Sequence, residues 1–189
     1  MALNASGLSY EHREVLLRDK PQAMLDVSPK GTVPVFITKD AKVVDESLAV
    51  MRYALAQNDP ENWLRQAHDS QQFVEIIDGD FKHHLDRYKY ASRYDETAKR
   101  GNVDLSHRKS AVMCLKAWED TLSVSRYLLG GTPSLADIAT FPFIRQFAAT
   151  EPEWWSKGPL PQTKEWLAEW LESDTFKAIM TKHAVWSEA

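Results

Sequence analysis

The chain of 189 residues contains a single cysteine, so it cannot form an internal disulfide. One unpaired thiol fits a reducing compartment, and we expect a cytoplasmic protein. No apolar run approaches the ~20 residues that span a bilayer. The first residues also lack the basic start and apolar stretch of a secretory signal. The sequence therefore predicts no membrane partner.

An excess of positive charge is also missing, because 23 Lys and Arg face 27 Asp and Glu, for a net charge of -4. A general phosphate-binding surface needs a basic excess, so we expect no nucleic-acid partner. The composition that remains is 43% hydrophobic, 26% charged and 11% aromatic, with 7 Trp. These proportions are typical of a globular protein with packed helices or a ligand cleft.

The first third of the chain alternates between helical and extended patterns. Gly7 follows a short helical segment and is placed to stop it in a left-handed conformation. The expected order is helix end, strand, short helix, strand, hairpin and helix, at residues 1–7, 10–17, 20–25, 33–37, 38–44 and from 46 onward. This order predicts a small α/β domain over residues 1–57.

After a short proline-containing linker at residues 58–60, every periodic segment is helical. Apolar residues at helical spacing predict four amphipathic helices, around residues 73–88, 112–122, 135–144 and 166–171. We therefore predict an all-helical second domain over residues 62–189. An α/β domain followed by an all-α domain leaves the function open.

Two short stretches of the α/β domain carry recognisable chemistry. Val33-Pro34 begins a strand, and a cis bond there would turn the backbone N–H and C=O of Val33 outward to pair with an extended peptide. Glu46 and Ser47 stand where a helix begins, and the amides of a helix N-terminus suit a carboxylate. Ser47 adds a hydroxyl donor, and Glu46 can take an ammonium group. A small peptide with a free α-amino acid end would satisfy all of these groups.

Residues 1–53 resemble the thioredoxin-like domain of glutathione transferases, particularly the omega-like and bacterial glutaredoxin-like branch. The resemblance rests on Lys20-Pro21, Val33-Pro34 and Glu46-Ser47, which occur in the family's order. It implies glutathione as co-substrate. It also implies that Lys20 reaches the glycine carboxylate, Val33 pairs with the cysteinyl part, and Glu46 and Ser47 hold the γ-glutamyl end. The alternative is that Pro34 and Ser47 are ordinary strand and helix boundary residues.

A second match lies in the helical region, at residues 130–138. Ser134 and Asp137 resemble the Ser-x-x-Asp element that begins the central helix of the family's second domain. Physically this spacing is a capping box, in which each side chain satisfies a backbone N–H of the other. We expect a structural role for this pair and no catalytic one.

The family's nucleophile-activating Cys, Ser or Tyr belongs to a strand–helix junction that would precede Met1. The resemblance therefore implies an N-terminally truncated domain and a weak or inactive chain, with no catalytic residue of its own. Cys114 falls in an apolar helix and reads as inert. Ser6 and Ser9 follow the first helix, and Tyr10 belongs to a predicted strand. A sheet without its first strand exposes an edge, so we expect domain swapping, dimer pairing or local disorder near residues 1–18.

The six histidines give no metal-binding pattern by spacing. His83 and His84 are adjacent, so on a helix we expect them to point in different directions. The other four lack an i, i+4 pairing or a cysteine at zinc spacing, and we predict no metal site. On the same helix, Arg87 and a group of tyrosines favour a solvated face with a buried aromatic stripe over a pocket for a second substrate. The tyrosines are Tyr88, Tyr90 and Tyr94.

The sequence and its resemblance to the family leave two alternative functions. The first is glutathione-dependent conjugation or thiol transfer by a homodimer, with an unknown small electrophile or disulfide as second substrate. The alternative is a non-enzymatic binding protein of the same fold, comparable to the stringent starvation proteins. Lys20, Glu46 and Ser47 favour the first, since a scaffold needs no peptide pocket.

Overall fold

The computed structural model describes residues 1–187, and the chain divides into two compact units. The first unit contains Met1–Leu64 together with the segment that begins at Asp174, and the second contains Arg65–Ser173. The sequence placed that last segment in the helical domain, over residues 62–189. It joins the first unit instead, because α11 (Asp174–Ile179) packs against α1 (Ala2–Ala5).

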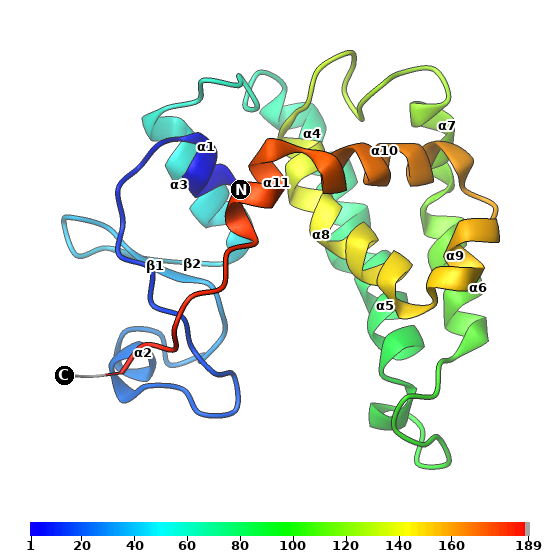
Figure 1. Cartoon of the computed structure of the whole chain (residues 1–189), viewed down its shortest axis with the longest axis horizontal. Coiled ribbons are helices and arrows are strands. Elements are labelled where there is room, and N and C mark those ends of the chain that lie inside the picture. Colours follow the sequence, from blue (N-terminus) through cyan, green and yellow to red (C-terminus); the bar gives the residue numbers. More distant parts are fainter. Residues whose placement is uncertain (188–189) are drawn as a thin grey trace. The chain divides into compact units, whose positions relative to one another are not determined.

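The first unit is built around a two-stranded antiparallel hairpin (Figure 1). Its register pairs Val35 with Asp45 and Ile37 with Val43, and the Thr38 N–H donates to the Lys42 carbonyl at 2.9 Å to close the turn. The predicted hairpin is therefore confirmed. The other elements of this unit also follow the expected order, as α1, α2 (Gln22–Val27), β1 (Val35–Ile37), β2 (Val43–Asp45) and α3 (Ser47–Gln57).

The C-terminal ends of α1 and α3 are joined by a hydrogen bond. Gly7 takes φ +67°, which confirms the predicted left-handed stop, and the carbonyl of Ser6 accepts a 2.9 Å bond from the Asn58 side chain. Val50, Ala54 and Leu55 of α3 are buried on the side that packs against α1. This small core fixes where α3 begins relative to the hairpin.

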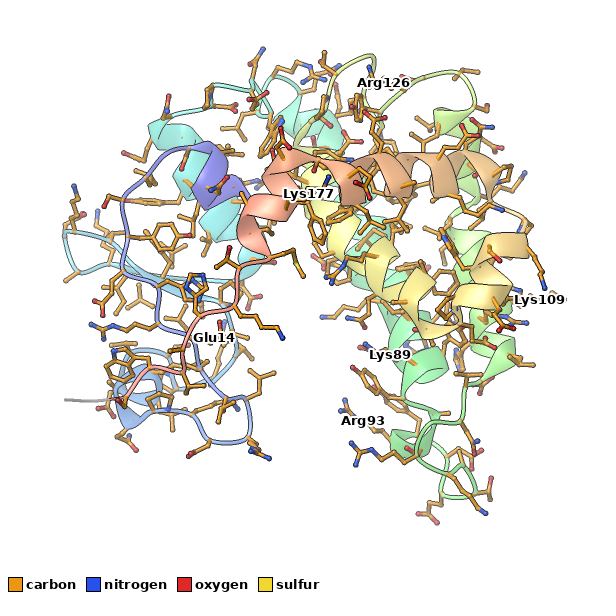
Figure 2. All side chains as sticks on the ribbon, viewed as in Figure 1. Glu14, Lys89, Arg93, Lys109, Arg126 and Lys177 are labelled. Atoms are coloured by element: carbon orange, nitrogen blue, oxygen red, sulfur yellow. The ribbon has the colours of Figure 1, made fainter. Side chains whose placement is uncertain are left out.

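The predicted strand at residues 10–17 is wrong. Only isolated bridges form there, from Glu14 to Val185 and from Leu16 to Asp19. Figure 2 shows Glu14 on this segment, where the C-terminal chain runs beside it and the Trp186 N–H donates to the Glu14 carbonyl at 2.9 Å. An apolar run supplies strand propensity, but a strand also needs a neighbouring backbone to pair with along its length. Leu17 accordingly stays 64% exposed.

The second unit is helical throughout. The first predicted helix is present but distorted at Gly79, and the second is interrupted at Leu115. Sequence periodicity missed the short α9, as it missed α11. The elements are α4 (Ala67–Ile76), η1 (Ile77–Phe81), α5 (Lys82–Lys89), η2 (Ala91–Arg93), α6 (Leu105–Cys114), α7 (Lys116–Leu122), α8 (Leu135–Thr150), α9 (Pro152–Lys157) and α10 (Pro161–Glu172). Among residues 1–187, every helix is too short or too polar to cross a bilayer.

Helix α8 forms the centre of the second unit, where it packs against α4, α5 and α10 (Figure 1). Five of its apolar side chains are almost completely buried, namely Leu135, Ile138, Phe141, Ile144 and Phe147. Because each fully buried side chain of this size contributes about 1.5–3 kcal/mol, this helix carries much of the unit's stability.

The capping box predicted at the start of α8 is confirmed. The fully buried Asp137 carboxylate accepts bonds from the Leu128 N–H at 3.0 Å, the Ser134 N–H at 2.9 Å, the Ser134 hydroxyl at 2.7 Å and the Trp166 indole N–H at 2.9 Å. Burial raises the pKa of the Asp137 carboxyl, and these hydrogen bonds oppose the rise. One carboxylate thus joins the loop before α8, the start of α8, and α10.

We predict that Asp137→Ala lowers the free energy of unfolding by about 3 kcal/mol or more, because several buried donors lose their acceptor together. Chemical denaturation followed by tryptophan fluorescence measures the loss. Asp120→Ala is the matched control, since this exposed aspartate pairs only with Lys116 at 3.6 Å. Its effect should stay within about 0.5 kcal/mol. Equal losses in the two variants would contradict the assignment.

Candidate functional site

The hairpin places two separated stretches of the first unit side by side. Residues 28–33, called the site loop below, lead into β1, and Glu46 and Ser47 follow β2. The register pairs Val35 with Asp45, so Val33 lies two residues before this pair on one side and Ser47 two residues after it on the other. Lys30 brings the site loop close to the end of β2, since its Nζ lies 3.0 Å from the Asp45 carboxylate and 3.4 Å from that of Glu46.

Val33 has the properties expected of a peptide-pairing residue. The Val33–Pro34 bond is cis, as the sequence predicted, and Val33 is 48% exposed. Among the hydrogen bonds of residues 1–187, none uses the backbone N–H or C=O of Val33. Both groups are therefore available to a ligand that approaches in an extended conformation.

Helix α3 begins next to this backbone with its first amides uncapped. Glu46 is the N-cap residue, its carbonyl accepts from the Val50 N–H at 3.1 Å, and no side chain of residues 1–187 caps the helix. The N–H groups of Ser47 and Leu48 thus face outward with the positive end of the helix dipole. Glu46 reaches this position at φ +72°, a conformation that costs a non-glycine residue about 1–3 kcal/mol.

Lys20 lies against the site loop from the other side. Gly31 takes φ +60°, and a Cβ placed on it would lie 3.8 Å from Lys20 Nζ and 3.2 Å from Leu25 Cδ2. The left-handed φ and this close approach both favour glycine at residue 31. The half-buried Lys20 ammonium is thereby held at the loop that also carries Val33.

Lys30 is a residue of this site that was not predicted from the sequence. Its hydrogen bonds to Asp45 and then Glu46 raise the pKa of the ammonium group, so it stays positively charged. Glu46 therefore already has a cation beside it, although its side chain is 69% exposed. The sequence feature that could have identified Lys30 is a basic residue in the turn immediately before Gly31. Two lysines and two carboxylates around one loop suit a ligand that itself carries both carboxylates and an ammonium group.

A cavity of about 480 Å³ lies beside this site in the same unit. Its wall includes Val33 and Pro34 but not Lys20, Glu46 or Ser47, so it meets the polar site along one edge only. The remaining wall is largely apolar, with Tyr10, Val15, Leu17, Phe36, Ile37 and Trp186, and it also includes Glu11, His12, Arg13 and Glu14. The cavity suits an apolar group, whereas the charged groups of a ligand belong at the site loop.

Cys114, Ser6 and Tyr10 were weighed above as substitutes for the missing nucleophile. Their surroundings in the structure are as follows. Burial raises the pKa of the Cys114 thiol, which keeps it protonated and unreactive at neutral pH. Ser6 is buried and donates to the Leu3 carbonyl at 3.0 Å. Tyr10 is 44% exposed and belongs to no strand.

The expectation that Arg87 and the three tyrosines share one helix is wrong for Tyr90 and Tyr94, because α5 ends at Lys89 and Tyr94 follows η2. Tyr88 is fully buried and donates to Glu151 at 2.6 Å, whereas Arg87 stacks on the 52% exposed Tyr94 at 4.4 Å. The expectation that His83 and His84 point apart is wrong. One ring nitrogen from each of these two, and one from His107, all lie within 4.8 Å of one another.

Comparison with known proteins places this geometry in a family. The model of the glutathione S-transferase N-terminal domain matches residues 1–63, and that of the C-terminal domain matches residues 41–172. The chain belongs to the glutathione S-transferase family. Its two-domain fold, with a thioredoxin-like domain followed by a helical domain, is therefore confirmed.

Individual members of the glutathione S-transferase family agree with this assignment. Omega-1 glutathione S-transferase of Mus musculus is 25% identical over 160 residues, which are 80% of this chain and 62% of the mouse protein. The chain thus spans less than two thirds of that relative's length.

Solved structures of family members share the fold. A ternary complex of BphK, a bacterial transferase, has a TM-score of 0.74 at 22% identity and covers 94% of this chain and 88% of its own. URE2P6 of Phanerochaete chrysosporium, in complex with oxidized glutathione, has a TM-score of 0.78 at 19% identity, with coverages of 94% and 86%. A glutathione S-transferase-I bound with lactoylglutathione has a TM-score of 0.74 at 21% identity, with coverages of 94% and 89%.

We predict that Gly31→Ala destabilises the first unit more than Gly7→Ala. Both glycines have positive φ, so each variant loses about 1 kcal/mol to backbone strain. Only the Gly31 variant must also displace Leu25, 3.2 Å away, since nothing lies within 4 Å at Gly7. Denaturation of the two variants under the same conditions measures the difference. Equal losses would show that the site loop tolerates a side chain at residue 31.

Proposed function

We propose that the chain binds glutathione at the site loop and the start of α3, as a glutathione S-transferase-like protein of conjugation or thiol transfer. The observation that carries the proposal is the unpaired, exposed backbone of Val33 beside the uncapped N-terminus of α3. A tripeptide with a γ-glutamyl end carries the groups that these two features accept. The relatives that hold oxidized glutathione and lactoylglutathione support the choice of ligand.

Each part of the tripeptide has a partner in this proposal. The cysteinyl residue pairs in extended form with the N–H and C=O of Val33. The α-carboxylate of the γ-glutamyl residue takes the first amides of α3 and the Ser47 hydroxyl, and its ammonium faces Glu46. The glycine carboxylate faces Lys20. Hydrogen bonds to charged groups contribute about 1.5–3 kcal/mol each, so these few contacts suffice for specific binding.

Lys30 has a separate part in the proposal. It lies between Asp45 and Glu46 and reduces the negative charge that an incoming carboxylate would meet. In this proposal the adjacent cavity binds an apolar group near Val33 and Pro34. We propose that the second substrate is a small electrophile or a disulfide, which the sulfur atom of glutathione attacks.

We predict that Ser47→Ala weakens glutathione binding by about tenfold, because the ligand carboxylate loses a hydroxyl donor. Isothermal titration calorimetry with reduced glutathione measures the change. Ser106→Ala is the matched control, because Ser106 is also exposed in the first turn of a helix and donates only to Asp104, at 2.6 Å. Its glutathione affinity should equal that of the unaltered chain.

Turnover is measured separately from binding, as glutathione consumption with an electrophile and as reduction of a mixed disulfide. Binding without turnover would establish a non-enzymatic glutathione-binding member of the family. Absence of glutathione binding, or equal affinity in the Ser47 and Ser106 variants, would refute the proposed site.

We also propose a homodimer in the cytoplasm. The first unit carries exposed apolar side chains, including Leu17 at 64% and Ile37 at 49% exposure, and both edges of its hairpin lack a further strand among residues 1–187. We predict a mass of two chains in light scattering after gel filtration. Leu17→Lys should shift the mass toward one chain, whereas Val124→Lys, at an 87% exposed site of the second unit, should not. A monomeric mass for the unaltered chain would contradict the proposal.

A further inference from the structure

A cluster of three histidines lies in the second unit, between the start of α5 and α6. His83 and His84 come from α5 and His107 from α6, and the two helices pack against each other. The ring centroids are 5.1 Å apart for His83 and His84, 5.0 Å for His84 and His107, and 5.8 Å for His83 and His107. No part of the proposed glutathione site uses these side chains.

We propose that His83, His84 and His107 form a binding site for a divalent transition-metal ion of the Zn²⁺ class. One nitrogen from each ring already lies within 4.8 Å of the other two. Imidazole nitrogen suits Zn²⁺, Cu²⁺ and Ni²⁺, whereas Mg²⁺ and Ca²⁺ require oxygen ligands. Three imidazoles leave one tetrahedral position for water, which exposed His83 keeps accessible.

The geometry requires only small side-chain movements. The Nδ1 atoms of His84 and His107 are 2.7 Å apart and share a hydrogen bond, with one ring donating and the other accepting. Tetrahedral zinc with bonds of about 2.0–2.1 Å sets its nitrogen ligands roughly 3.3 Å apart. The closest pair must therefore separate by roughly 0.6 Å, and the most distant nitrogens must approach, which rotation about the side-chain bonds allows.

Two carboxylates favour a cation at this cluster. Asp80 adds an attractive charge near His84. Asp104, which accepts from the backbone N–H of His107 at 3.2 Å, supplies another.

One residue opposes the ion. Arg87 lies one turn after His83 and places its Nη1 3.0 Å from His83 Nδ1. Its positive charge repels a cation and its N–H occupies a ring nitrogen. Removal of this guanidinium should therefore strengthen metal binding, an effect in a direction that damage to the fold would not produce. The labelled Lys89 and Arg93 lie farther along, at the end of α5 and in η2 (Figure 2).

The test is calorimetric titration of the full chain, free of any polyhistidine tag, with ZnCl₂ and separately with MgCl₂. We expect one Zn²⁺ per chain and no Mg²⁺. His84→Gln and His83→Gln should each weaken Zn²⁺ binding by about tenfold or more. Arg87→Gln should tighten it by several fold. His68→Gln is the matched control, because this exposed histidine lies on α4 of the same unit, outside the cluster.

Co²⁺ in place of Zn²⁺ gives a second measurement, since tetrahedral nitrogen ligands produce visible absorption bands. Circular dichroism shows that each variant is folded, and the exposed His83 variant remains informative if the His84 variant is not. The proposal is overturned if Zn²⁺ does not bind, or if it binds with one affinity to the unaltered chain and to the His83, His84 and His68 variants. Weaker binding in the Arg87 variant would also overturn it.

Discussion

The pairing of β1 with β2 is the constraint on which the arrangement of the first unit depends. The two strands have only three residues each, yet their register decides which residues meet beyond the ladder. A shift by one residue would turn every side chain of the shifted strand to its other face and move the site loop relative to the start of α3. The small core between α1 and α3 completes this constraint, because it fixes the start of α3 relative to β2.

The second unit is organised differently, around the buried carboxylate of Asp137. A charged group in an apolar interior is tolerated only where donors surround it, and here the donors come from a loop and two helices. Hydrogen bonds have direction, so this one group specifies how those segments meet, whereas the apolar contacts of α8 could be satisfied in several ways.

Much of this was predictable from the sequence because local rules govern it. The left-handed Gly7, the hairpin at residues 38–44, the start of α3 and the Ser134–Asp137 capping box each depend on a few neighbouring residues. The residues assigned to the site loop and the start of α3 came from their resemblance to a family, and their roles stay a prediction. Lys30 was missed, since its partners lie 15 and 16 residues later and its own turn offers no sign of them.

Features that depend on distant partners were not predictable. Residues 10–17 have strand-forming side chains, but their pairing was decided by which backbone lies beside them. The histidine cluster forms because two helices pack, and spacing along one helix says nothing about a residue 23 positions away. The boundary at residue 174 followed the contact of α11 with α1, which no periodicity in α11 indicates.

The return of the chain to the first unit has a consequence for how the protein is made. Helix α11 is synthesised after the whole second unit, yet it packs on α1, which is synthesised before that unit. During synthesis the first unit must therefore wait for its closing helix while the whole second unit emerges. The nascent chain spends that interval with α1 uncovered on one side, when assistance from chaperones would matter most.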